Sequence, residues 1–469
     1  MLKSNNGGLR EVPFRIDDPE MIPTARYHDE EFYQAELDHL WPRVWQMACR
    51  LEQIPNVGDW VEYSNVGKSV IVVRTKDGIR AFHNHCRHRG VPVAGGDGKS
   101  HGNCAKTGFI CPFHGWRYNM EGKNTFVYAS HMFSDEVLNP DALNLIPCRA
   151  EIWGGAVFIN HDEDAPSFRE TMGPLADRME EQGLSELRAE WWYGTVLPAN
   201  WKLAMEAFQE SYHVLRTHPQ LHHAAPDYWN SRFGKNTGGL GATEGRGTTV
   251  RDMIKSLVDN YESLSTGMAG LVHQKEVDIG RSLQDIELPE GPEEAIGAWF
   301  HRFRAELTEQ LRARGEDIPD LNETAERHAP NALDFIFPHY FLLFPLTTAT
   351  AYRIRPLGPE SCYYEIWSLT HYPKGEEPEP LMAPIDLPHD SKDFPLIPQQ
   401  DYANIPLQQA GTHSTGFEYM RLAKDVEGLI SNYQRVIDGY LAGVADDKLA
   451  AATRKLSGNF DGPILDLEL

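Results

Sequence analysis

Two pairs of cysteine and histidine constrain this chain more than any other feature of its sequence. Cys86 and His88 form a Cys-x-His pair, and Cys111 and His114 form a Cys-x-x-His pair further along. Thiolate and imidazole ligands select zinc or an iron–sulfur cluster over magnesium or calcium. Where two imidazoles replace two thiolates on one iron of a [2Fe–2S] cluster, its reduction potential rises above that of an all-thiolate cluster. A single zinc ion is the alternative, although zinc ribbons usually carry Cys-x-x-Cys pairs.

The residues around both pairs carry a family resemblance. The segments Cys86-Arg-His88-Arg-Gly and Cys111-Pro-Phe-His114-Gly-Trp resemble the Rieske motif of ring-hydroxylating, non-haem iron oxygenases. The resemblance implies that these four residues hold a Rieske [2Fe–2S] cluster, and it favours that cluster over a zinc ion.

The stretch between the two pairs departs from the family pattern. From Arg89 to Ile110 it is longer than the family usually shows, and the excess lies at residues 97–107. These residues are polar and include glycine, so they predict a surface loop. His101 and Cys104 fall within this loop, outside the shared spacing, and we expect neither to be a ligand.

Composition limits the remaining possibilities. A chain of 469 residues predicts at least two domains. Six cysteines are too few for a disulfide scaffold and indicate a reducing, cytoplasmic location. The N-terminal residues and the absence of a long apolar run predict neither a signal peptide nor a membrane span. The net charge of −24 argues against nucleic acid as a partner.

The pattern along the chain predicts an α+β protein. Residues 45–165 show short β-branched and aromatic runs separated by turns, which is typical of a small β domain. Residues 1–44 read as an arm with one helix that packs on the catalytic domain, and residues 166–469 alternate helices and strands. This layout resembles that of Rieske oxygenase α subunits. The resemblance implies a β-rich Rieske domain followed by a helix-grip-like catalytic domain with an antiparallel sheet and a long C-terminal helix.

Individual elements of the second domain follow from the spacing of apolar residues. We expect helices at 168–184, 201–215 and 417–441, strands at 189–196, 341–355 and 361–370, and a surface loop at 377–398. The glycine-rich segment at 236–249 lacks a preceding strand and a following packed helix, so it does not predict a dinucleotide site.

Residues 200–219 contain candidates for a second metal site. His213 and His218 are five residues apart, which is about 140° around a regular helix, so they converge only if the helix ends between or beside them. Pro219 disfavours helical geometry at His218 and makes such an ending plausible. Two histidines and a carboxylate are the ligands of non-haem Fe(II) oxygenases, and the spacing resembles the mononuclear iron motif of the family.

The third ligand must come from elsewhere in the chain. The segment around Asp401 resembles the family segment that supplies an aspartate ligand, so we assign Asp401 to this role. Its alternative role is a helix N-cap, and Glu418 and Asp425 are rival carboxylates. His222 and His223 add two further histidines close to the site.

Glu210 occupies a position where the family usually has aspartate. The resemblance implies that it links His213 to His114 of the partner subunit in a head-to-tail ring, which is a homotrimer or a multiple of one, with or without beta subunits. Some members that act on quaternary amines also have glutamate here. We expect Asn200 and Tyr212 to support the ligating histidines, which need partners for their second ring nitrogen.

Together these features predict the terminal component of a mono- or dioxygenase. A separate NAD(P)H-dependent reductase, with or without a ferredoxin, supplies electrons for O2 activation at mononuclear Fe(II). We expect a small aromatic or other hydrophobic ring substrate, as in aromatic hydrocarbon catabolism, with a quaternary amine or other small polar substrate as the alternative. An electron carrier without oxygenase activity is the competing class. The candidate pocket residues are mostly apolar: Met205, Phe208, Gln209, Leu342, Phe344, Leu346 and Thr348.

Overall fold

The computed structural model describes residues 9–95, 98–226, 229, 249–328 and 333–469. Most of the glycine-rich segment at 236–249 lies outside this description. Among the described helices, none is both long and apolar enough to cross a membrane.

The N-terminal part of the molecule is built on a seven-stranded antiparallel sheet with the order β2-β11-β10-β5-β4-β3-β6. Its strands are β2 (Gln46–Arg50), β3 (Asp59–Asn65), β4 (Lys68–Thr75), β5 (Gly78–His83), β6 (His101–Asn103), β10 (Pro147–Trp153) and β11 (Ala156–Asn160). A continuous run of β-branched residues contributes to its core, since Val70, Ile71, Val72 and Val73 of β4 are all fully buried.

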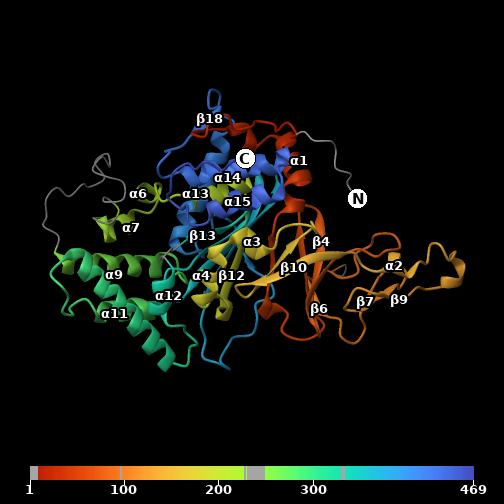
Figure 1. Cartoon of the computed structure of the whole chain (residues 1–469), viewed down its shortest axis with the longest axis horizontal. Coiled ribbons are helices and arrows are strands. Elements are labelled where there is room, and N and C mark those ends of the chain that lie inside the picture. Colours follow the sequence, from red (N-terminus) through yellow and green to blue (C-terminus); the bar gives the residue numbers. More distant parts are fainter. Residues whose placement is uncertain (1–8, 96–97, 227–228, 230–248, 329–332) are drawn as a thin grey trace.

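A small three-stranded sheet extends from this part of the molecule. It consists of β7 (Phe109–Ile110), β8 (Arg117–Tyr118) and β9 (Asn124–Phe126). Figure 1 shows β7 and β9 in the extension at the right of the molecule, next to the short helix α2 (Pro140–Leu143).

The C-terminal part contains a six-stranded sheet with the order β13-β14-β15-β16-β12-β17. Its strands are β12 (Arg188–Leu197), β13 (Leu333–Ile336), β14 (Tyr340–Leu343), β15 (Ala349–Gly358), β16 (Ser361–Thr370) and β17 (Ile385–Asp386). All pairs are antiparallel except β12 with β17. The predicted α+β class with an antiparallel sheet is confirmed.

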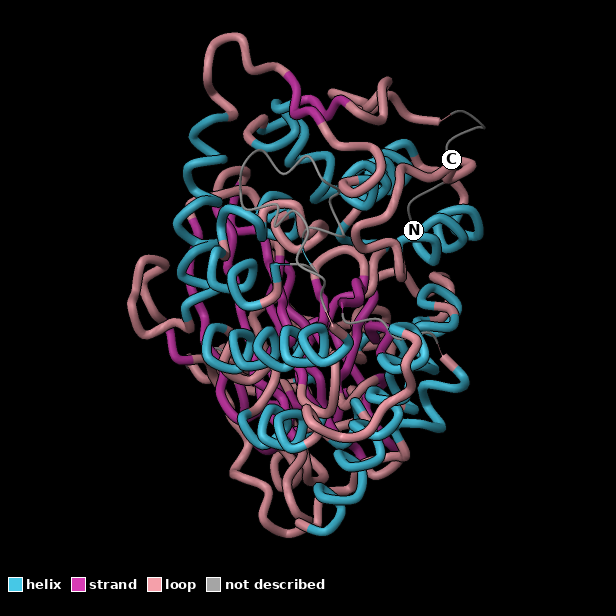
Figure 2. Tube along the Cα trace, turned by 90° about the vertical axis from the view of Figure 1, so that its left-hand side faces the viewer, coloured by secondary structure: helices cyan, strands magenta, loops and turns pink. Residues whose placement is uncertain are grey.

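Helices pack against this sheet, and several of them lie in front of the strands in Figure 2. The C-terminal part contains the helices α9 (Val250–Gly267), α10 (Gln274–Ser282), α11 (Pro292–Ala313), α12 (Leu321–Arg327), α13 (Leu396–Gly411), α14 (Gly428–Ala442) and α15 (Asp446–Leu456). Helix α14 is buried along most of its length, and its Tyr433 ring lies 4.9 Å from that of Phe337. Two short helices, α3 (Phe168–Met172) and α4 (Pro174–Glu181), share the predicted span 168–184 and are separated by Gly173 at φ 60°.

The N-terminal segment contributes a strand, β1 (Met21–Pro23), and a helix, α1 (Glu30–His39). Strand β1 pairs with β18 (Tyr419–Arg421) near the other end of the chain. The Arg26 guanidinium is fully buried and pairs with Asp438 of α14 at 2.5 Å. These contacts agree with the expected packing of the arm on the C-terminal part, while the domain boundaries stay predictions.

Several predicted elements differ from the structure. The span 417–441 holds β18 before the helix, which begins only at Gly428, and the span 341–355 holds two strands with a break at 344–348. The span 377–398, expected to be loop, includes β17 and the start of α13. Residues 101–103 of the expected surface loop form β6, because Val61 and Asp59 of β3 pair with His101 and Asn103. The side chain of Cys104 is consequently buried.

Candidate metal centres

Two loops of matching backbone geometry carry the four predicted cluster ligands. The Cys86 amide donates to the Val91 carbonyl at 2.8 Å, and the Gly90 amide donates back to Cys86 at 2.9 Å. The second loop repeats this pattern, with Cys111 donating to Trp116 at 2.8 Å and Gly115 to Cys111 at 3.0 Å. Gly90 and Gly115 both have positive φ, at 79° and 71°, which residues with a Cβ rarely adopt. Each loop therefore presents a cysteine and a histidine in a fixed relation.

The four side chains meet between the loops. Cys86 and Cys111 are buried, at 2% and 3% exposure, and the rings of His88 and His114 lie 4.7 Å apart. The Nδ1 atoms of both histidines are buried and lack a hydrogen-bond partner in the protein. Buried polar atoms without partners are costly, so two thiols and two such nitrogens fit a [2Fe–2S] cluster with mixed ligands.

The spacing of these four residues disfavours a single zinc ion. In the described part of the chain, ligand atoms of three His, Cys, Asp or Glu side chains approach within 4.8 Å at two places, and neither place involves these residues. A tetrahedral zinc site would draw all four ligands around one point. A cluster of two irons places its ligands around two points, which agrees with the wider spacing of these four side chains.

Neighbouring side chains support the cluster ligands. The Tyr118 hydroxyl lies 3.2 Å from the Cys86 sulfur and accepts a hydrogen bond from the Arg87 amide at 2.9 Å. The Trp116 ring stacks on His88 at 4.9 Å, while the exposed Phe113 ring lies against His114 at 3.9 Å. Both histidines are half-buried, with the Trp116 ring against His88 and the exposed Phe113 ring against His114.

The second set of predicted ligands comes from a broken helix and from α13. Instead of one helix over 201–215, the structure has α5 (Trp201–Glu206), a loop, α6 (Val214–Thr217) and α7 (Pro219–Ala224). The Glu210 carboxylate accepts from the His213 amide at 2.9 Å, and Asp461 accepts from the Ser211 amide at 2.5 Å. These side-chain acceptors take the backbone donors that a continuous helix would use, so the helix prediction is wrong over 207–213.

This break brings three predicted ligands together. Asp401 Oδ1 lies 3.0 Å from His218 Nε2 and 3.9 Å from His213 Nε2, and the three donor atoms are within 4.8 Å of one another. Asp401 Oδ2 is buried without a hydrogen-bond partner. Two imidazoles and a buried carboxylate with a free oxygen fit a mononuclear iron of the facial-triad kind.

Asp401 is better placed for this role than the rival carboxylates. Asp401 lies inside α13, whose N-cap is Pro395, so it does not serve as an N-cap. Glu418 and Asp425 are exposed, and neither belongs to a three-donor group among the described residues.

Each of the two histidines has a partner for its second nitrogen. Glu210 Oε1 lies 2.7 Å from His213 Nδ1, and Gln400 Oε1 lies 2.7 Å from His218 Nδ1. Burial lowers the pKa of His213, but its hydrogen bond to Glu210 and the charges of Glu210 and Asp401 raise the pKa above its ordinary value. Both imidazoles therefore direct Nε2 toward Asp401.

The residues expected to give this support are placed differently. Asn200 caps α5 by accepting from the Lys202 amide at 2.9 Å, and it donates to the Pro359 carbonyl at 2.6 Å. Tyr212 is 54% exposed. The supporting partners are Glu210 and Gln400, and Gln400 was missed although it directly precedes Asp401.

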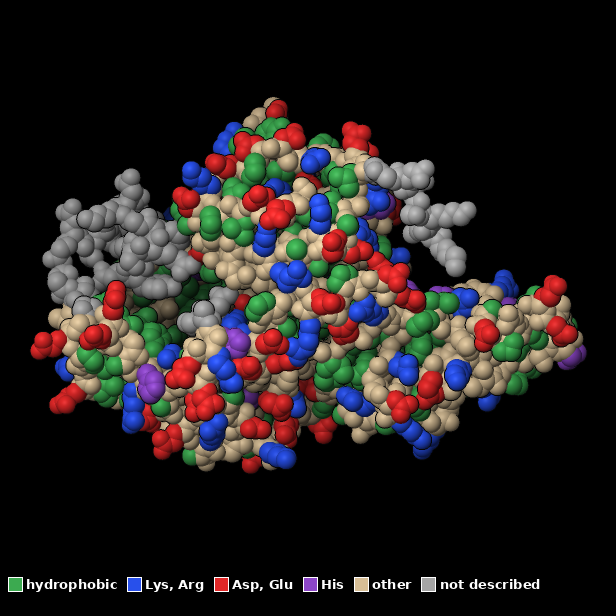
Figure 3. Space-filling model, viewed as in Figure 1, with side chains coloured by type: hydrophobic (Ala, Val, Ile, Leu, Met, Phe, Trp, Pro, Cys, Tyr) green, Lys and Arg blue, Asp and Glu red, His purple; other side chains and the backbone are tan. Residues whose placement is uncertain are grey.

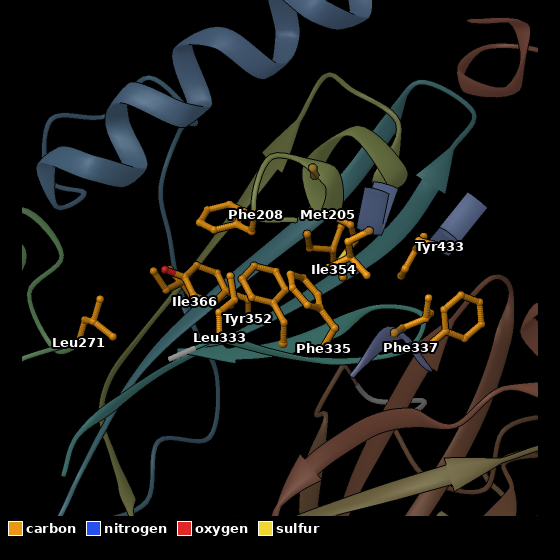
Figure 4. Close-up of a cluster of buried hydrophobic side chains, with 14 of the residues drawn as sticks. Met205, Phe208, Leu271, Leu333, Phe335, Phe337, Tyr352, Ile354, Ile366 and Tyr433 are labelled. Atoms are coloured by element: carbon orange, nitrogen blue, oxygen red, sulfur yellow. The ribbon is translucent and has the colours of Figure 1, made fainter. Parts of the chain in front are cut away.

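An aromatic cluster adjoins the three ligands. Phe208 lies 4.9 Å from Phe341 and 5.1 Å from Tyr352, and the last two rings are stacked at 4.3 Å (Figure 4 shows Phe208 and Tyr352). Burial raises the pKa values of Tyr352, Tyr364 and Tyr402, and the charge of Asp401 raises them further. These three rings therefore lie near the Asp401 carboxylate.

Part of the predicted pocket does not belong to this cluster. Met205 and Phe208 share the hydrophobic core that contains Tyr352, and Gln209 is fully buried with no hydrogen-bond partner for its side-chain amide. Leu342 and Phe344, by contrast, pack with Trp45 and Phe158 in a separate core. They lie outside the cluster around Phe208, because alternate residues of a strand face opposite sides of the sheet and it is Phe341 that faces Phe208. Their assignment to the pocket stays a prediction.

The two candidate metal centres lie well apart in one chain. In Figure 1 the extension with β7 and β9 is at the right, whereas α6 and α13 are left of centre. The surface of the extension carries apolar side chains among charged ones (Figure 3), and Phe113, Tyr128 and Met132 are 53%, 66% and 77% exposed.

Two family models match the chain. The model described as the ring hydroxylating alpha subunit (catalytic domain) matches residues 184–443, and the Rieske [2Fe-2S] domain model matches residues 44–130.

Curated relatives include carnitine, choline and glycine betaine monooxygenases and a biphenyl dioxygenase. The carnitine monooxygenase oxygenase subunit of Escherichia coli strain K12 is 29% identical over 221 residues, covering 46% of this chain and 57% of the relative. The biphenyl 2,3-dioxygenase subunit alpha of Rhodococcus jostii strain RHA1 is 34% identical over 198 residues, covering 40% of this chain and 41% of the relative. The matches thus span only about half of the length of these relatives.

Solved structures share the fold. A quaternary ammonium Rieske monooxygenase in complex with L-carnitine superposes with a TM-score of 0.54 and 17% identity, covering 96% of this chain and 99% of the other. Naphthalene 1,2-dioxygenase from Rhodococcus sp. bound to indole superposes with a TM-score of 0.60 and 19% identity, covering 91% of this chain and 95% of the other.

Proposed function

The chain belongs to the ring hydroxylating alpha subunit family and carries its Rieske domain, and from this premise we propose that it is the terminal component of a Rieske oxygenase. Family membership confirms the two expected cofactors, a [2Fe–2S] cluster and a mononuclear iron. The observation that carries the proposal is the convergence of His213, His218 and Asp401 in a chain that also holds the Cys-His loops. A protein that only carries electrons would not require this second set of metal ligands.

The proposed mechanism assigns a task to each residue of the sites. Cys86, His88, Cys111 and His114 hold the cluster, and His213, His218 and Asp401 hold the iron. When bound, these groups supply single-electron transfer and O2 activation. Glu210 and Gln400 fix the orientation of the two imidazoles, and the aromatic residues around Phe208 exclude water from the same region.

The two centres work together across a subunit interface. A separate NAD(P)H-dependent reductase, with or without a ferredoxin, provides the electrons. Glu210 then bridges His213 to His114 of the partner subunit in a homotrimer. The half-buried position of His114 and the exposed apolar side chains of Phe113, Tyr128 and Met132 support such a contact. Apolar side chains gathered at a surface favour burial in an interface.

The substrate class that we propose is a small quaternary amine. Carnitine, choline and glycine betaine monooxygenases are among the relatives. The rings of Phe208, Phe341 and Tyr352 next to the Asp401 carboxylate offer faces that attract a quaternary ammonium group. An aromatic ring compound is the second candidate, which the biphenyl dioxygenase relative and the apolar character of the same rings favour.

The iron assignment is tested by His213→Ala. We expect the variant to keep the visible spectrum and labile sulfide of the cluster, to lose the mononuclear iron and to lose turnover. His223→Ala, at an exposed neighbouring histidine, is the matched control and should retain both. Turnover that survives in His213→Ala would refute the assignment, and a wild-type chain that binds only the two cluster irons would indicate an electron carrier.

The substrate class is tested with the wild-type protein and a competent reductase. Oxygen uptake coupled to product formation is compared for carnitine, choline, glycine betaine and biphenyl. We expect uptake with a quaternary amine and none with biphenyl. The opposite result would support the ring substrate and leave the iron assignment intact.

A further inference from the structure

A second group of metal-binding side chains lies outside both iron centres. His83, Cys148 and His161 each direct a donor atom into one space, and these atoms are within 4.8 Å of one another. The Cys148 sulfur is 4.0 Å from His161 Nδ1, and the rings of His83 and His161 lie 5.3 Å apart.

The strand register explains why these residues meet. On β10, Cys148 is paired with Ala81 of β5, and His83 lies two residues further along β5, on the same face of the sheet. Arg149 of β10 is paired with Asn160 at the end of β11, so His161 follows at the level of Cys148. Three neighbouring strands therefore hold the group, and hydrogen bonds such as that from the His83 amide to the Ile146 carbonyl at 2.9 Å fix their ends.

The surroundings suit a cation ligand set. Cys148 is 5% exposed, and both histidines are half-buried. Burial lowers the pKa of His161 to about 4 and also lowers that of His83, so both imidazoles are neutral and have a free lone pair at neutral pH. Two charges lie nearby. The positive charge of Lys68 adds to the lowering of the pKa values of His83 and His161. Burial raises the pKa of Cys148 to about 12, and the negative charge of Glu163 adds to this rise.

We propose that His83, Cys148 and His161 bind one Zn2+ ion, in a site separate from the cluster and the mononuclear iron. One thiolate and two imidazoles are preferred zinc ligands, and three protein ligands leave a fourth position for water or for the nearby carboxylate of Glu163. Zinc–ligand bonds of about 2.0–2.3 Å need donor atoms slightly closer than those present, which small side-chain rotations provide.

Binding has a proton balance that can be measured. The Cys148 thiol must lose its proton to the buffer when zinc binds, whereas the neutral histidines lose none. One proton is thus released per zinc ion, and zinc affinity rises with pH. The bound ion would join the ends of β5, β10 and β11 just before the loop that starts at Cys86.

The experiment uses purified holoprotein with the cluster and the mononuclear iron in place. After equilibrium dialysis against Zn2+, elemental analysis should find one zinc per chain with no loss of iron. Cys148→Ser and His161→Ala should lose at least about nine-tenths of this zinc while keeping the cluster spectrum. His131→Ala, at an exposed histidine, is the matched control and should bind zinc like the wild type.

Zinc X-ray absorption of the wild-type protein tests the site without any variant. We expect one sulfur and two imidazole nitrogens around the ion, together with the release of one proton per zinc. Absence of zinc, zinc that displaces iron, a coordination shell without sulfur, or full zinc binding by Cys148→Ser would each overturn the proposal.

Discussion

At the scale of single residues, the hydrogen-bond partners of the two histidines decide how well they can hold iron. Gln400 and Glu210 each take one imidazole nitrogen at 2.7 Å and leave the other for the metal. Such partners fix the ring orientation, and their loss typically costs about 10- to 100-fold in metal affinity.

Gln400→Leu tests this role. The substitution removes the acceptor of His218 Nδ1 but keeps the approximate volume of the side chain. We expect mononuclear iron to be retained about 10- to 100-fold less tightly in a chelator competition, with an unchanged cluster spectrum. Gln408→Leu, at an exposed position on the same helix, should behave like the wild type. Equal iron affinity in Gln400→Leu would show that this hydrogen bond does not support the site.

The sequence was informative about residues whose signal is local. The Cys-His spacing identified the cluster loops because each loop carries both of its ligands within a few residues. Gln400 and the tyrosines near Asp401 were missed because their roles depend on α13 and β15 packing against α5, which no local spacing reveals. Leu342 was placed in the pocket because its chemistry suits either face of a strand, and only the register shows which face it occupies.

At the scale of elements, the end of α5 contains a buried acid. Glu206 accepts hydrogen bonds from the Tyr27 hydroxyl at 2.9 Å and from Gln434 Nε2 at 2.5 Å. Burial raises its pKa from 4.5 to about 7, against the opposing effect of these bonds and of nearby Lys202. Between these two pH values the unfolded chain releases the proton and the folded chain retains it. The contribution of Glu206 to stability is therefore present below the unfolded pKa and is lost as the pH rises through about 7.

Glu206→Gln should reduce this pH dependence because glutamine resembles the protonated acid. At about pH 8 we expect the variant to be more stable than the wild type by up to about 3 kcal/mol, with little difference at about pH 4.5. Urea unfolding followed by tryptophan fluorescence measures the difference. Glu186→Gln, at an exposed position, should show no such trend. A stability difference that is the same at both pH values would contradict the account.

Elements with a strong, uninterrupted pattern were predicted well, and interrupted ones were not. The strands at 189–196 and 361–370 match β12 and β16 within one or two residues. The helix expected over 201–215 breaks because Glu210 and Asp461 take its backbone donors, and Asp461 lies in a distant part of the chain. The hydrogen bond from Ser211 to Asp461 is therefore a tertiary interaction, which the spacing of apolar residues does not reveal.

At the scale of the whole molecule, the fold separates the two centres. The cluster loops are on an extension of the N-terminal part, while the triad lies among helices of the C-terminal part (Figure 1). The resemblance to Rieske oxygenases predicted both parts because their motifs cover most of the chain. Substrate choice was less accessible, since it depends on how rings from several elements surround the site. In the proposed function, the cluster of one chain serves the iron of the next.

Complementation between two inactive variants tests this requirement most directly. Cys86→Ser lacks the cluster and His213→Ala lacks the mononuclear iron, so each alone should be inactive. Co-expressed with different tags and purified as mixed assemblies, the two should recover a substantial fraction of wild-type turnover, because an intact cluster in one chain then faces an intact iron site in its neighbour. Mixed assemblies that stay inactive, or a wild-type monomer that is fully active at high dilution, would contradict transfer between subunits.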